Sequence, residues 1–158
     1  MPRITDFILI KHIGQPVLVI RKKTNVTEIP QVLGSAFSQI GSYIEELGEI
    51  STDVPYIGYH DFRNLNENNI DMEIGFPIAK KLPSKGDIQF KIMPEGKSVF
   101  CIFRGDYNDL GPVYDEMMEW IKNKGFEIAG DCYETYLNGP PFPEEEMLTK
   151  VTIPLKLK

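Results

Sequence analysis

One carboxylate stands in a stretch of the sequence that otherwise favours a buried strand. Glu134 lies in the segment Cys132-Tyr133-Glu134-Thr135-Tyr136, among aromatic and apolar neighbours. A carboxylate is costly to bury unless a partner pairs with it. Near aromatic rings it could hold a cationic ligand, because water screens Coulomb attraction poorly there, and each cation–π contact adds roughly 0.5–2 kcal/mol. Burial also suits an acid to general acid–base work. Glu134 is therefore the predicted centre of a functional site.

A structural explanation for Glu134 stands beside the functional one. Lys150 is in the last predicted strand of the chain, and an acid on one strand can form an ion pair with a lysine on its neighbour. The sequence leaves open whether Lys150 lies near Glu134.

The elements that must position Glu134 follow from hydrophobic periodicity. Continuous or alternating apolar runs predict strands, and apolar residues at a spacing of three and four predict helices. Strands are expected over 4–13, 17–20, 54–60, 70–78, 88–93, 99–103, 131–137 and 151–157, with one helix from Pro30 to Leu47 and another from about Leu110 to Gly125.

The chain contains an internal repeat. A shift of 77 positions without a gap places Leu33 on Leu110 and Gly48 on Gly125, and it aligns the apolar faces of the strands that follow. Each half, about residues 4–81 and 86–158, is a strand–strand–helix–strand–strand unit too small to bury its own faces. We predict a single domain of the α+β class over residues 1–158, with an antiparallel sheet, two main helices, pseudo-two-fold symmetry and a central cleft.

The repeat also isolates the unusual residue, because Glu134 falls on Ile57 of the first half. Successive residues of a strand point to opposite faces, so Cys132, Glu134 and Tyr136 share one face and Tyr133 points away. Trp120, on the second predicted helix, is expected at the cleft margin, since a buried indole N–H needs a partner. The predicted ligand-binding residues are Glu134, Tyr136, Trp120, Tyr59, Ile57, Tyr56 and Cys132, although each aromatic taken singly is more often a core residue.

Composition excludes several classes of function. A net charge of −6 over 158 residues argues against nucleic-acid binding. Two widely spaced cysteines form neither a disulfide framework nor a metal cage, and His12 and His60 stand alone, so we expect no metal and no cofactor. The sequence offers neither a membrane span nor a signal peptide, so we expect a soluble, cytoplasmic protein.

Several motifs together resemble the GyrI-like family. They are the segment 104–110 (RGDYNDL), the helix with Trp120, the segment 133–138 (YETYLN), the segment 149–155 (TKVTIPL) and the first-half strand 71–78 (DMEIGFPI). This family comprises the effector-binding domains of AraC-type and MerR-type multidrug-responsive regulators and stand-alone relatives. The resemblance implies a duplicated unit of the SHS2 type, and Glu134 matches the family's central acid. Many relatives carry a second acid where this chain has Lys150.

Three functional hypotheses follow, the first two implied by the resemblance and the third based on the acidic surface of the chain. The leading one is a stand-alone binder of amphipathic, often cationic aromatic molecules, for sensing or sequestering xenobiotics, without direct DNA binding, because no helix-turn-helix pattern precedes the domain. The second is a hydrolase for electrophilic cyclopropane-containing compounds, with Glu134 and Tyr136 as catalytic residues. The third is a module that binds a protein partner such as gyrase.

Overall fold

The computed structural model describes residues 4–139 and 141–156. In chain order the strands are β1 (Ile8–His12), β2 (Gln15–Thr24), β3 (Tyr56–Tyr59), β4 (Ile70–Pro77), β5 (Gln89–Met93), β6 (Gly96–Arg104), β7 (Cys132–Tyr136) and β8 (Leu148–Leu155). The two main helices are α1 (Ile29–Glu46) and α2 (Gly111–Asn123), and short 3-10 turns are η1 (Val26–Glu28), η2 (Phe62–Asn64), η3 (Tyr107–Asp109) and η4 (Glu144–Glu146).

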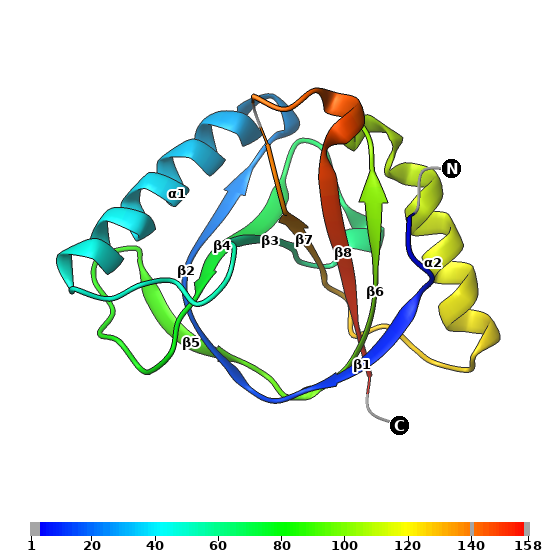
Figure 1. The fold of residues 1–158 in the computed structure, drawn as a ribbon, viewed down its shortest axis with the longest axis horizontal. Coiled ribbons are helices and arrows are strands. Elements are labelled where there is room, and N and C mark those ends of the chain that lie inside the picture. The colour runs from blue at the N-terminus through cyan, green and yellow to red at the C-terminus, as the bar shows by residue number, and fades with distance from the viewer. Residues whose placement is uncertain (1–3, 140, 157–158) are drawn as a thin grey trace. The chain divides into compact units, whose positions relative to one another are not determined.

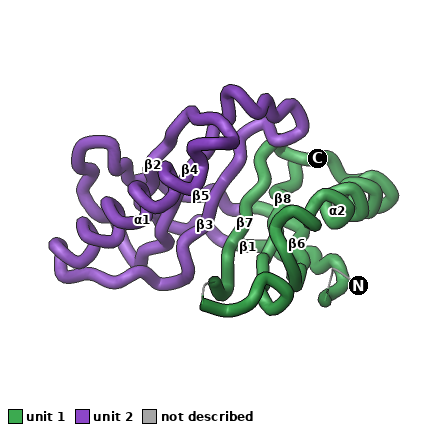
Figure 2. The backbone as a smooth tube through the Cα atoms, turned by 90° about the horizontal axis from the view of Figure 1, so that it is seen from above, with its two compact units in different colours: residues 1–12, 96–158 green, residues 13–95 purple. Residues whose placement is uncertain are grey.

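The chain divides into two units, which Figure 2 shows in green and purple. Unit 1 comprises residues 1–12 and 96–158, and unit 2 comprises residues 13–95. Each contains an antiparallel sheet, with strand order β1-β6-β8-β7 in unit 1 and β3-β4-β2-β5 in unit 2. The first strand of each half of the sequence has thus joined the other half, since β1 pairs with β6 and β5 pairs with β2.

In unit 2, α1 covers one face of the sheet (Figure 1). The helix begins where Pro30 fits the first turn without losing a hydrogen bond. Phe37 of the helix meets Phe76 of β4 edge-on, with ring centroids 6.1 Å apart. Alternation then places Ile74 and Met72 on this same face, and both are fully buried. The buried stripe of α1 consists of Ala36, Ile40, Tyr43 and Ile44.

In unit 1, α2 covers its sheet in the same manner (Figure 1). The buried stripe of α2 is Val113, Met117 and Ile121. Met117 reaches the sheet, because its Sδ lies 3.8 Å from Sγ of Cys101 in β6. Cys101 pairs with Val151 of β8, which in turn pairs with Glu134 of β7. Directly paired residues share a face, so Glu134 points to the side of the sheet that α2 covers.

The fold class is confirmed as α+β, with antiparallel pairing and two main helices. The first strand is shorter than predicted. Thr5 accepts the backbone N–H of Ile102 through its side chain, so that donor is not available to a ladder and regular pairing begins only at Ile8. The last strand begins three residues earlier than predicted, at Leu148, and its predicted end at residue 157 lies outside the described residues. The pseudo-two-fold relation and the central cleft stay predictions.

Candidate functional site

Glu134 is a buried carboxylate held by phenol groups. Its relative exposure is 8%. Tyr114 donates a hydrogen bond of 2.5 Å to Oε2, and Tyr136 donates one of 2.7 Å to Oε1. Each carboxylate oxygen therefore has one donor, and an ionised carboxylate offers about four acceptor positions in all. The site retains the capacity to accept further hydrogen bonds.

Three elements of unit 1 position this group. Glu134 and Tyr136 are two residues apart in β7, which puts both side chains on the α2 face. Tyr114 comes from the first turns of α2, and its Oη also lies 3.5 Å from Sγ of Cys132. Tyr107 comes from η3, and its ring centroid lies 4.8 Å from that of Tyr136. Tyr107 is 39% exposed, so this aromatic pair forms the solvent-facing side of the group.

Burial and the charge of Glu134 raise the pKa of two of these phenols, Tyr107 and Tyr114. Burial raises the pKa of Tyr114 well above its usual range, and the charge of Glu134 raises it further. Burial and the same carboxylate also raise the pKa of Tyr107. Both groups therefore remain O–H donors at neutral pH. We call Glu134 and the side chains of Tyr107, Tyr114, Cys132 and Tyr136 the Glu134 cluster.

Glu134 has no counter-ion among the residues that the structure describes. None of the ion pairs among the described residues includes it, and no Lys, Arg or His of the described chain lies within pairing distance. The Lys150 alternative is wrong. Lys150 pairs with Thr135, the neighbour of Glu134, and so points to the opposite face of the sheet. There its Nζ lies 4.5 Å from the centre of the Phe100 ring.

The structure brings Glu134, Tyr136 and Cys132 together but places Trp120 elsewhere on α2. The Trp120 ring packs against Phe7 and Phe126, with centroid distances of 6.2 and 6.4 Å, and Lys124 lies over it. None of these partners belongs to the Glu134 cluster. A role for Trp120 in ligand binding stays a prediction.

The predicted first-half residues belong to unit 2. Ile57 is fully buried and pairs with Ile74, so it faces α1. Tyr59 is half-buried and shares that face, whereas Tyr56 points to the opposite one. Their contribution to a ligand site also stays a prediction.

Sequence reasoning missed Tyr107 and Tyr114 as site residues. Tyr114 fits the apolar stripe of its helix, so periodicity alone assigns it to the core. The hydroxyl of Tyr114 could have indicated a role in the site, because a buried phenol usually has a hydrogen-bond partner. Tyr107 lies in a turn, where no periodicity applies.

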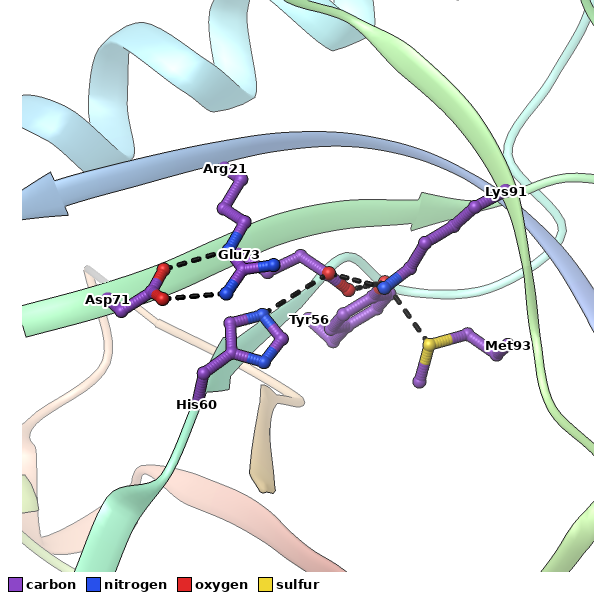
Figure 3. A network of polar contacts seen from close by, with 7 residues as sticks. All are labelled: Arg21, Tyr56, His60, Asp71, Glu73, Lys91 and Met93. Atoms are coloured by element: carbon purple, nitrogen blue, oxygen red, sulfur yellow. Dashed lines mark hydrogen bonds and ion pairs between the residues drawn. The ribbon is translucent and has the colours of Figure 1, made fainter. Parts of the chain in front are cut away.

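Unit 2 contains a second buried carboxylate, Glu73 of β4, with a relative exposure of 2% (Figure 3). Tyr56 donates a hydrogen bond of 2.6 Å to Oε2, and Lys91 forms an ion pair with Oε1. His60 Nε2 lies 3.5 Å from Oε1, and Tyr56 Oη also contacts Sδ of Met93. Figure 3 shows all four side chains turned toward the Glu73 region, from β3, β5 and the segment after β3.

Glu73 differs from Glu134 because its charge is compensated inside the unit. Burial by itself raises the pKa of Glu73, but its polar contacts with His60, Lys91 and Tyr56 outweigh burial and lower the pKa to about 2. The sequence places Glu73 in the predicted strand 70–78 and predicts no role for it. Gly75 was the missed signal, since glycine inside a strand often marks a close approach. A Cβ at Gly75 would lie 2.3 Å from Cζ of Tyr56.

Two further observations bear on other kinds of site. Over residues 4–139 and 141–156, no three His, Cys, Asp or Glu side chains are grouped as metal ligands would be. In the same ranges, no helix combines the length and apolar character that a membrane span requires.

Comparisons with solved structures show the same fold. The C-terminal domain of EcmrR superposes with a TM-score of 0.82 at 21% identity, over 96% of this chain and 97% of that one. This chain spans 57% of EcmrR as seen in a complex with DNA, with a TM-score of 0.80 and 20% identity over 96% of this chain.

Two other solved structures also share the fold. The hydrolase encoded by lin2189 from Listeria innocua has a TM-score of 0.75 at 11% identity, over 98% of this chain and 93% of that one. SAV2435, solved with bound tetraphenylphosphonium, has a TM-score of 0.63 at 11% identity, over 96% of this chain and 94% of that one.

No curated protein matches the sequence. The family model of the GyrI-like small molecule binding domain matches residues 10–156, which is nearly the whole chain. This protein belongs to the GyrI-like family of small-molecule-binding domains.

Proposed function

We propose that this protein captures or senses amphipathic cations that carry aromatic rings, with Glu134 as the anionic contact. One observation carries the proposal, namely that Glu134 is buried and has no cationic partner among the described residues. Removing a carboxylate from water is unfavourable, and phenol hydrogen bonds compensate that loss only in part. A ligand cation supplies the missing charge.

The surroundings of Glu134 suit an aromatic ligand. The rings of Tyr107 and Tyr136 are tilted against each other, with their centroids 4.8 Å apart. A cation above such a ring gains roughly 0.5–2 kcal/mol. SAV2435, which has the same fold, was solved with tetraphenylphosphonium, a cation with aromatic rings.

The second buried carboxylate, Glu73, is a poorer candidate for binding a ligand cation than Glu134. Glu73 is paired with Lys91, so a ligand cation there would have to displace a lysine. At Glu134 a ligand cation would not have to displace a cationic side chain of the described residues. Cation binding is therefore proposed at Glu134 and not at Glu73.

The direct test is a fluorescence titration with a cationic rhodamine and with an uncharged rhodamine derivative of like shape. In the Glu134→Gln variant, affinity for the cationic dye should fall about 10- to 100-fold, the equivalent of roughly 1.4–2.8 kcal/mol. The uncharged dye should bind with unchanged affinity. Glu119→Gln is the matched control, because it removes one exposed carboxylate from α2 in the same unit.

Two results would count against the proposal. Equal weakening of both dyes would mean that the substitution damages the site without revealing a charge interaction. An unchanged affinity for the cationic dye would place the ligand elsewhere. If neither dye binds the unmodified protein, the hypothesis of a protein partner gains support.

Hydrolysis is the second candidate function. It is favoured by the phenol donors around an acid and by the fold shared with the lin2189 hydrolase. Here Glu134 would activate a water molecule, and Tyr136 would donate a proton to an electrophilic substrate. Incubation with excess of a cyclopropane-containing electrophile separates the two functions. Loss of only one equivalent of compound per protein rules out turnover.

A further inference from the structure

A hydroxyl group beside the Glu134 cluster is buried without a partner. Thr149 of β8 has a relative exposure of 0%. Its Oγ1 makes no hydrogen bond to any described residue. A buried hydroxyl left unsatisfied costs about 1–3 kcal/mol of stability. Such a group calls for a functional explanation, and a ligand atom is one partner that would satisfy it.

The strand register puts this hydroxyl next to the proposed site. Thr149 pairs directly with Tyr136 of β7 and with Phe103 of β6. Directly paired side chains share a face, with Cβ atoms about 4.5–5.5 Å apart. Thr149 therefore lies on the α2 side of the sheet, together with Glu134. Glu134 is its diagonal neighbour, at about 7–8 Å between backbone positions, which a single ligand group can bridge by contacting both side chains.

The chemistry of the two groups defines the ligand. A carboxylate that already accepts from Tyr114 and Tyr136 has acceptor positions left, and a threonine hydroxyl has two lone pairs. An ammonium group with N–H donors can satisfy both at once. Quaternary ammonium and phosphonium cations bring charge but no N–H donor, so they leave the Thr149 hydroxyl unpaired.

We propose that the Glu134 site prefers protonated amines to fully substituted cations of the same shape, with the Thr149 hydroxyl accepting an N–H from the ligand. This inference rests on the proposed function, because it takes Glu134 as the cation contact. It adds a chemical class of ligand and a residue that determines specificity.

The test compares two biphenyl-4-ylmethyl ligands by calorimetry, a primary ammonium and its N-trimethyl analogue. The measured quantity is the ratio of the two affinities. The two cations differ in hydration, but this difference is the same for every protein variant, so it cancels when the ratios of two variants are compared. Thr149→Val replaces the hydroxyl by a methyl group of similar size. It should reduce the preference for the primary ammonium about tenfold, as expected for one hydrogen bond to a charged group. Thr149→Ser, which keeps the hydroxyl, should retain the preference.

Thr152→Val is the matched control. Thr152 is in the same strand but pairs with Tyr133 and Phe100, so it points to the opposite face. It should leave the affinity ratio unchanged. A thermal melt reports folding, and Thr149→Val should melt at an equal or higher temperature, because it removes an unsatisfied buried hydroxyl.

An affinity ratio that is the same in Thr149→Val and in the unmodified protein would overturn the proposal and leave Thr149 as a strand residue in the core. Binding of the trimethyl cation alone would overturn it too, and if that binding depends on Glu134 the proposed function still stands. If neither cation binds the unmodified protein, both proposals fail.

Discussion

Lys150 and Glu134 lie on adjacent strands but on opposite faces of the unit 1 sheet. Thr135 pairs with Lys150, and Glu134 pairs with Val151, so one step in register separates the two charges. Lys150 lies over the Phe100 ring instead, with Nζ 4.5 Å from its centre. The sheet therefore separates Glu134 from Lys150, the lysine that the sequence suggested as its partner.

Lys150→Gln is therefore expected to change affinity for a cationic rhodamine by less than about threefold, since Lys150 points away from Glu134 on the opposite face of the sheet and salt screens charges that are far apart. The measurement is the same titration, repeated at low and high salt. A tenfold gain in affinity on removing Lys150 would show that the lysine opposes the ligand charge despite its position.

Tyr114→Phe tests how far the phenols stabilise the buried carboxylate. The substitution removes the 2.5 Å hydrogen bond to Oε2 of Glu134 and leaves the ring in place. The free energy of unfolding should fall by about 1–3 kcal/mol, because the carboxylate loses a donor that water does not replace. Denaturant titration of Tyr114→Phe, Glu134→Gln and the double variant gives the coupling between the two groups. Strict additivity would argue that the hydrogen bond contributes nothing.

Glu73→Gln tests the ion-paired network of unit 2 by its pH dependence. The folded-state pKa of Glu73 is about 2, below the usual 4.5. Ionised Glu73 therefore contributes stability that is fully present above about pH 4.5 and is lost as the pH falls toward 2. The lowered pKa of Glu73 corresponds to about 3 kcal/mol of stability at neutral pH.

The difference in unfolding free energy between the unmodified protein and Glu73→Gln should thus be largest at neutral pH. It should shrink steadily in denaturant titrations below about pH 4.5. Glu67→Gln, which removes an exposed carboxylate of the same unit, controls for net charge. A difference that stays constant with pH would contradict the lowered pKa of Glu73.

Gly75→Ala should destabilise the protein although alanine normally suits a strand at least as well as glycine. The added Cβ would meet the Tyr56 ring at 2.3 Å, and the hydrogen bond to Glu73 holds that ring in place. The expected loss is about 1–3 kcal/mol, as for other overpacked cores. Gly34→Ala is the control, since nothing lies within 4 Å of a Cβ there and the site is in α1. It should stabilise the protein by about 0.5–1 kcal/mol.

Much of the fold could be predicted because hydrophobic periodicity is a local property. The helices at α1 and α2 and the strands around Ile74 and Glu134 carry apolar residues at the spacing of their secondary structure. The 77-residue repeat then indicated two similar units, and alternation along β7 correctly put Cys132, Glu134 and Tyr136 on one face.

The exchange of first strands between the two halves of the sequence could not be predicted in this way. Pairing of β1 with β6 joins residues about ninety positions apart, and periodicity gives the face of a strand but not the identity of its neighbour. For the same reason the sequence could not decide whether Lys150 forms an ion pair with Glu134. A shift of one residue in the strand register would move the lysine side chain to the other face of the sheet.

By itself, the sequence determined the α+β class and the membership of the GyrI-like family, and it singled out Glu134 as the acid that the repeat does not explain. Only the tertiary structure decided how the two buried acids differ. Glu73 forms an ion pair with Lys91 of β5, which β2 separates from β4, whereas Glu134 accepts a hydrogen bond from Tyr114 of α2 and has no cationic partner among the described residues. The physical reason is that charge compensation depends on distances of a few ångströms between residues far apart in the chain, which strand register and helix packing set.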